Sequence, residues 1–148
     1  MDDKSKLRVP YAMSVHGEDE INACVEVLRT STQMGPCVGK FEKNIASSFD
    51  KSHGIFVNSG SSALLLSLEA FKFPQGGEVI TPALTFGTTV SSIVKAGLKP
   101  AFVDVGLTTL NIDSSKVNEM ITENTVAMCV PNLMGNLNRP GFTKDSIT

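Results

Sequence analysis

The sequence has 148 residues, of which 41% are hydrophobic and 19% are charged. This size and composition are typical of one soluble domain with a core of its own. The formal net charge of −2 gives no electrostatic reason to expect nucleic acid or an anionic membrane surface as a partner.

The chain shows no pattern of a targeting or membrane segment. Its polar first residues have no apolar signal-peptide core, and no apolar run approaches the ~20 residues that a membrane span requires. The three cysteines form no CxxC pair and indicate a reducing compartment. We therefore expect a cytoplasmic protein with no metal site, no membrane partner and no nucleic-acid partner.

The first 50 residues predict an irregular arm followed by two helices. Breakers at Pro10 and Gly17 mark an arm over residues 1–17, and residues 30–39 predict a loop because they hold Gly-Pro and a second glycine. Apolar residues at helical spacing predict one helix before that loop and one after it. They are Ile21, Cys24, Val25 and Leu28 in the first helix, and Phe41, Ile45 and Phe49 in the second.

Beyond residue 50, short apolar runs alternate with helical segments. The predicted strands cover residues 55–57, 78–81, 101–105 and 126–130. The predicted helices cover residues 63–71, 87–96 and 113–121, and Gly97 is expected to cap the second of them. This alternation predicts an α/β fold with a mostly parallel sheet and flanking helices.

Three junctions follow predicted strands and should meet at one edge of a parallel sheet, where ligands gather. NSGSSA at 58–63 offers glycine, hydroxyls and a helix start that suit an anion. TPALTFG at 81–87 has Phe86 where a flat ligand could stack. PNLMGN at 131–136 offers two amides. A serine-rich helix cap, a core phenylalanine and an asparagine turn are the structural alternatives.

Two common phosphate motifs, GxxxxGK[ST] and GxGxxG, do not occur in the sequence. Their absence argues against a P-loop nucleotidase and against a standard dinucleotide fold. An anion site without either motif suggests a phosphate ligand smaller than a nucleotide or a dinucleotide.

In their order and spacing, these segments resemble the DegT/DnrJ/EryC1/StrS family over about residues 10–137. The matching runs are VNSGSSAL at 57–64, GEVITPALTF at 77–86, AGLKPAFVDV at 96–105 and TLNID at 109–113. The resemblance implies a sugar aminotransferase or sugar 3-dehydratase that depends on pyridoxal 5'-phosphate (PLP). It also implies the aspartate-aminotransferase-like large domain (PLP fold type I), a nucleotide-linked sugar substrate and a homodimer.

The resemblance also implies the cofactor-binding residues. Gly60, Ser61 and Ser62 are expected to hold the PLP phosphate, Phe86 to lie against the pyridine ring, and Asn132 to join them. The turn NLMGN at 132–136 resembles that of the dehydratases acting on nucleotide-linked 4-keto-6-deoxyhexoses, whereas aminotransferase members usually carry a histidine there. Both branches remain open.

The resemblance places the catalytic groups beyond residue 148. These are the aspartate that pairs with the pyridine nitrogen and the Schiff-base lysine, which is a histidine in the dehydratases. We therefore expect an arm and two helices over 1–50, and over 51–148 an incomplete PLP-binding domain that lacks its C-terminal half. Such a fragment should have no catalytic residue, no activity and weak or absent PLP binding.

Some features depart from the family pattern or carry no chemistry. Gln33 stands where members often have threonine, and residues 138–144 match the family poorly. Surface positions are expected for three lysines and both histidines, which are Lys95, Lys99, Lys116, His16 and His53. Two other interpretations remain: a non-catalytic remnant that binds a phosphorylated ligand or a partner, and an unrelated α/β binding domain.

The family's sheet separates the strand matching 55–57 from the other three. A chain of this length would then leave an apolar edge exposed, which is unfavourable. We expect either that residues 55–57 move beside residues 126–130 or that a second copy of the chain covers the edge.

Overall fold

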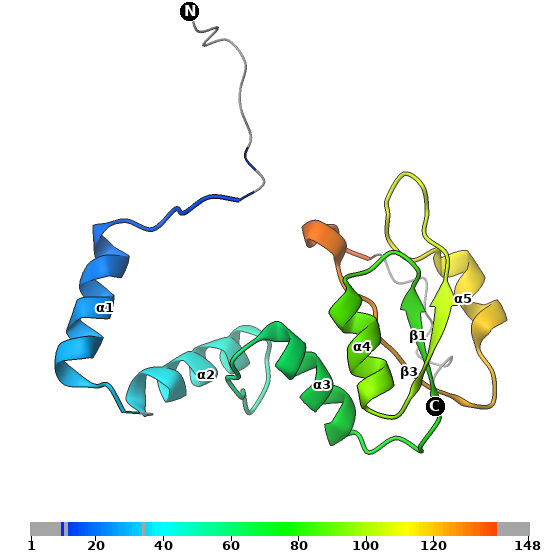
Figure 1. The fold of residues 1–148 in the computed structure, drawn as a ribbon, viewed down its shortest axis with the longest axis horizontal. Coiled ribbons are helices and arrows are strands. Elements are labelled where there is room, and N and C mark those ends of the chain that lie inside the picture. Colours follow the sequence, from blue (N-terminus) through cyan, green and yellow to red (C-terminus); the bar gives the residue numbers. More distant parts are fainter. Residues whose placement is uncertain (1–9, 11, 34, 139–148) are drawn as a thin grey trace, which may run out of the picture. The chain divides into compact units, whose positions relative to one another are not determined.

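The computed structural model describes residues 10, 12–33 and 35–138. The chain divides into two compact units between Phe56 and Val57, and Figure 1 labels most of their elements. Of the predicted arm, the described residues before Gly17 form neither helix nor strand. Of the poorly matching segment 138–144, residues 139–144 lie outside the described residues.

The first unit contains α1 (Glu18–Thr30) and α2 (Pro36–Ser48). The first turn of α1 is acidic, and the backbone N–H of Gly17 donates to Glu20 Oε2 at 2.7 Å. This bond is one half of a capping box, because Gly17 has no side chain to make the other half. The predicted loop over residues 30–39 is too long, because α2 already begins at Pro36. Proline suits the first helical position, where its missing N–H has no partner to lose.

The first unit buries little apolar surface. In α1 no residue is buried, and in α2 only Ala46 is. Phe41 makes an edge-to-face contact with Phe56, with ring centroids 5.4 Å apart, and Glu42 Oε1 accepts the Phe56 N–H at 2.8 Å. These contacts tie the end of the unit to α2 without forming a core.

The second unit is built on three parallel strands, β1 (Glu78–Pro82), β2 (Lys99–Val103) and β3 (Thr125–Met128), in the order β2-β1-β3. Ile80 lies opposite Ala101 on one side and Met128 on the other. The parallel α/β prediction is therefore confirmed, with strand boundaries that differ from the predicted ones by one or two residues.

Helices cover both faces of this sheet, α3 (Gly60–Ala70) and α4 (Gly87–Lys95) on one and α5 (Ser114–Met120) on the other (Figure 1). Neighbouring residues of β1 point to opposite faces, so Val79 packs in the first layer and Ile80 in the second. The first cluster joins Val79 to Leu68, Ile93 and Leu98. The second joins Ile80 to Val103, Ile112 and Val117.

The end of α4 follows the prediction. Gly97 has a positive φ of 78° and donates its N–H to Val94 O at 3.0 Å, while the Leu98 N–H reaches Ile93 O at 3.1 Å. These two bonds form a Schellman motif, which satisfies carbonyls that the helix leaves open. Leu98 then packs against Ile93 in the core.

The strand predicted at residues 55–57 is wrong. Those residues form no β-structure, and Ile55 and Phe56 are 85% and 56% exposed. Among the described residues β3 pairs only with β1, so residues 55–57 have not moved beside it. A run of three residues does not persist as a strand without a neighbouring ladder.

Within the described part of the chain, no helix is both long and apolar enough to cross a membrane. The lysines and histidines expected at the surface are all exposed. One of them, Lys116, forms two ion pairs: its Nζ lies 3.6 Å from Asp104 Oδ2 and 3.8 Å from Asp113 Oδ2.

Candidate functional site

The second and third junctions lie at one edge of the sheet. Residues 83–86 follow β1 and residues 129–136 follow β3, and these two strands are parallel neighbours. The first junction reaches its place differently, because no strand precedes it. Its helix α3 is held by packing against α4 and β1 through Leu68, Ile93 and Val79.

The first turn of α3 offers unengaged hydrogen-bond donors. Ser59 caps the helix, and its Oγ accepts the Ser62 N–H at 3.1 Å while donating to Ser62 Oγ at 3.1 Å. For the N–H groups of Gly60 and Ser61, the described residues provide no acceptor. No acidic side chain lies in this turn. Such a helix start favours a bound anion through its free N–H groups and its dipole.

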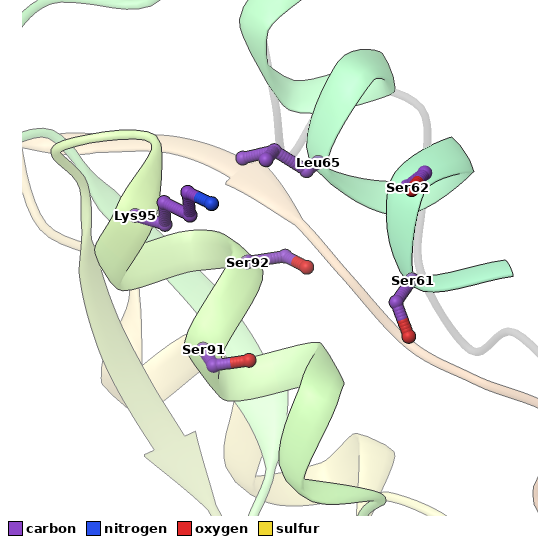
Figure 2. A pocket seen from close by; sticks show the side chains of 6 residues that line it. All are labelled: Ser61, Ser62, Leu65, Ser91, Ser92 and Lys95. Carbon is purple, nitrogen blue, oxygen red and sulfur yellow. The ribbon is translucent and has the colours of Figure 1, made fainter. Parts of the chain in front are cut away.

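Space is available beside this turn. A methyl group added at Gly60 would meet no other atom within 4 Å, so a ligand can approach the backbone there. Next to it, a groove of about 210 Å³ runs between α3 and α4 (Figure 2). Its lining residues are Ser61, Ser62 and Leu65 from α3, and Ser91, Ser92 and Lys95 from α4.

The α4 wall of the groove is polar. Ser92 is only 5% exposed, and the described residues provide no hydrogen-bond partner for its hydroxyl, whereas Ser91 Oγ donates to Thr88 O at 3.3 Å. Figure 2 shows the Ser92 hydroxyl and the Lys95 ammonium group both directed from α4 toward α3. Among the residues that the structure describes, Lys95 is the only one with a charged side chain that lines the groove.

Sequence reasoning did not assign Ser91, Ser92 and Lys95 to this site. A signal was present, because Ser91 and Lys95 are four residues apart, which places them on one face of the helix. Only the packing of α3 against α4 turns that face toward the serines of the first junction.

Phe86 and Asn132 lie apart from this groove. Phe86 is the residue before α4 and is 73% exposed. Its ring is therefore accessible for stacking against a flat ligand. The Asn132 Oδ1 accepts the backbone N–H of Asn138 at 2.9 Å and its Nδ2 at 3.0 Å. This side chain therefore helps to hold its own loop, which leaves only its amide nitrogen for a ligand.

The loop after β3 is anchored by asparagines. Asn111 Nδ2 donates to the carbonyl oxygens of Asn136 and Leu137 at 3.2 and 3.1 Å, and Asn136 Nδ2 donates to Thr109 O at 2.7 Å. Asn111 belongs to the TLNID run at 109–113. That run therefore has a structural role in this fold, because its hydrogen bonds hold the loop of the third junction in place.

Comparisons with known proteins agree with this architecture. The sequence profile of the DegT/DnrJ/EryC1/StrS aminotransferase family matches residues 14–139. A GDP-4-keto-6-deoxy-D-mannose 3-dehydratase of Yersinia pseudotuberculosis is 38% identical over 142 residues, which are 91% of this chain and 36% of that protein. A 3-oxo-glucose-6-phosphate:glutamate aminotransferase of Bacillus subtilis is 34% identical over 80% of this chain and 27% of its own length.

Among solved structures, the E. coli GDP-4-keto-6-deoxy-D-mannose-3-dehydratase with bound hydrated PLP matches with a TM-score of 0.82 at 34% identity. The match covers 88% of this chain and 36% of that one. The predicted large-domain architecture of PLP fold type I is therefore confirmed. The chain spans about a third of the length of the relatives that it matches.

Proposed function

The chain belongs to the DegT/DnrJ/EryC1/StrS aminotransferase family, and on that premise we propose that it is the N-terminal portion of a PLP-dependent enzyme. The enzyme would modify nucleotide-linked 4-keto-6-deoxy sugars, by 3-dehydration or by amino transfer. Relatives named for dehydration of a GDP-linked 4-keto-6-deoxy sugar and for amino transfer to a sugar phosphate support the two branches.

The observation that carries the proposal is the first turn of α3. Two backbone N–H groups lack an acceptor among the described residues, no carboxylate competes with a ligand, and Gly60 leaves room for close approach. A phosphate group fits this donor set because its oxygens accept several hydrogen bonds and its charge favours the helix N-terminus. Gly60, Ser61 and Ser62 would hold the phosphate of PLP.

The other two predicted residues would contact the cofactor away from its phosphate. Phe86 exposes a ring at the edge of the sheet, where it would lie against the pyridine, and Asn132 would offer its free amide nitrogen. When bound, PLP supplies an electron sink for chemistry next to the sugar carbonyl. The described residues of this chain would bind and orient the cofactor.

The branch of the family is proposed from one turn. The segment 132–136 carries asparagine where aminotransferase members usually carry histidine, which favours the dehydratase branch. The structure gives this turn a folding role, because Asn132 Oδ1 bonds to Asn138. An asparagine in place of the histidine is therefore consistent with dehydratase chemistry and also with a different packing of this loop.

The test is binding of pyridoxamine 5'-phosphate, which has the phosphate but no aldehyde to react with surface lysines. We expect saturable binding by calorimetry, about tenfold weaker for Ser61→Asp, because a carboxylate at the helix start repels the phosphate. Ser67→Ala, on the same helix, is the matched control. Equal affinity for wild type and Ser61→Asp would remove the phosphate site from α3.

Activity is a separate matter. The 148-residue chain by itself is expected to show no conversion of a 4-keto-6-deoxy sugar nucleotide with added PLP, because the resemblance places the Schiff-base residue further along. Product formation would be followed by chromatography against heat-treated protein. Reproducible turnover would instead show a catalytic group within the chain.

A second candidate function keeps the same site without catalysis. The chain would then be a binding module for a phosphorylated ligand or for a partner. The unengaged donors of α3 favour it as much as they favour the enzyme, and binding of phosphate or pyrophosphate as tight as that of pyridoxamine 5'-phosphate would select it.

A further inference from the structure

We infer that Lys95 and Ser92 of α4 form the second wall of the phosphate site. A phosphate monoester held by the first turn of α3 would thus also be held from across the groove. The inference rests on the proposed function, since it takes the occupant of the α3 turn to be a phosphate group. It adds to that function the residues that supply a positive charge and a further hydroxyl group.

Charge is the first argument. A phosphate monoester carries about −1.5 to −2 charges at pH 7, whereas a helix N-terminus contributes only about +0.5. The turn from Gly60 to Ala63 contains no basic side chain. Across the groove, Lys95 supplies a full positive charge, and the ion pairs found among the described residues involve Lys116 and leave Lys95 without one.

The Ser92 side chain is the second and independent argument. The residue is only 5% exposed, and its hydroxyl lacks a hydrogen-bond partner among the described residues. It lines the groove and is directed toward α3 (Figure 2). A phosphate oxygen in the groove would accept this O–H, which would give the hydroxyl a fixed partner.

Other functions for Lys95 must be separated from this one. It lies in the last turn of α4, where a cation favours the helix dipole, and Leu65 faces it across the groove (Figure 2). Both effects would support folding. Neither would depend on whether a ligand carries a phosphate, so the test compares ligands with and without that group.

The experiment titrates pyridoxamine 5'-phosphate and pyridoxamine against wild type, Lys95→Gln, Lys95→Arg and Ser92→Ala. The glutamine substitution keeps a long polar side chain but removes its charge. We expect Lys95→Gln to bind the phosphorylated ligand about tenfold more weakly and pyridoxamine unchanged. Lys95→Arg should retain most of the affinity, and Ser92→Ala should lose about threefold.

Salt and an unrelated lysine provide the controls. Affinity of wild type should fall more steeply with added NaCl than affinity of Lys95→Gln, because the ion pair is screened. Lys99→Ala removes an exposed lysine that lines a different cavity, beside β2, and should leave the affinity unchanged. Circular dichroism checks that each variant is folded. If Lys95→Gln is unfolded, the affinity of Lys95→Arg for the two ligands provides the test instead.

The outcomes separate this inference from the proposed function. Wild-type affinity in Lys95→Gln, together with weak binding in Ser61→Asp, would overturn the inference and keep the site on α3. Equal loss for both ligands in Lys95→Gln would also overturn it, as a structural effect. No binding by wild type, or no effect of any substitution on α3 or α4, would overturn both.

Discussion

The two units of the molecule use the same local rules and differ in what they bury. Helix α1 has an acidic first turn whose Glu20 accepts the N–H of Gly17, and α5 has an Asp113 cap. Yet α1 buries no residue, whereas Val79, Ile80 and Ile93 in the second unit are fully buried. The apolar faces of the first unit are exposed, for example at Leu28, Phe41 and Phe49.

The difference teaches what periodicity can and cannot tell. An apolar stripe at helical spacing predicts a helix in both units, because that information is local. Stability comes mainly from burying the stripe. Among the described residues, only those of the second unit form a sheet against which a helix can bury it. We therefore expect substitutions in the two units to have unequal effects.

The largest expected difference is between Ile80→Ala and Ile21→Ala. Ile80 is 0% exposed at the centre of the sheet, and Ile21 is 44% exposed on α1. Loss of Ile80 should cost about 2–5 kcal/mol of unfolding free energy, which is enough to unfold a small unit. Loss of Ile21 should cost less than about 1 kcal/mol. Urea denaturation followed by circular dichroism measures both, and equal costs would mean that α1 is buried in solution.

Glycine substitutions should have opposite signs in the two units. Gly97 has a φ of 78°, which strains any residue with a Cβ atom, and an added methyl would also displace the flexible end of the Gln75 side chain. Gly97→Ala should therefore destabilise by about 1–2 kcal/mol. Gly39 is helical in α2 and would meet no atom within 4 Å. Gly39→Ala should stabilise by up to about 1 kcal/mol. Thermal melts test the signs, and a stabilising Gly97→Ala would contradict the Schellman cap.

The three cysteines should report the difference in burial kinetically. Cys24 and Cys37 in the first unit are exposed, whereas Cys129 packs against the core beside β3. Burial raises the pKa of the Cys129 thiol, and the thiolate is the reactive form. With a disulfide reagent at about pH 8, we expect two fast thiols and one at least about tenfold slower. A Cys129→Ser variant should lose the slow phase, and three equal rates would contradict the assignment.

The smallest expected effect is the pH-dependent stabilisation of a helix start by a carboxylate, and it should be similar in the two units. A hydrogen bond from the Gly17 N–H lowers the pKa of Glu20, and hydrogen bonds from the Ser115 hydroxyl and N–H lower the pKa of Asp113. Because the folded pKa is depressed, each carboxylate stabilises fully above its ordinary pKa, 4.5 for Glu20 and 3.8 for Asp113.

This stabilisation should fade as pH falls through the lowered folded values. Glu20→Gln and Asp113→Asn should therefore weaken their helices at about pH 6 and differ less from wild type near about pH 2.5, measured by side-chain NMR titration and helical circular dichroism. Since both groups are fully exposed, the changes should be small. A carboxyl that titrates above its ordinary pKa would contradict the cap at that helix.

The features that the sequence determined are local. The helix after Gly17, the cap at Gly97 and the three strands of the sheet follow from spacing, turn residues and apolar runs within a few positions. The fold class and the phosphate turn proposed at Gly60 were also accessible, because the resemblance depends on ordered short runs of residues. At α2 the Gly-Pro pair at 35–36 opens the helix, whereas the prediction placed it within a loop.

Tertiary structure decided what depends on distant partners. Residues 55–57 have the composition of a strand, but a strand exists only where another chain segment completes its ladder of hydrogen bonds. The same holds for the site. Asn132, which was expected at a ligand, also bonds to Asn138, and the groove that unites Ser61 with Ser92 and Lys95 exists only because α3 packs beside α4 on one face of the sheet.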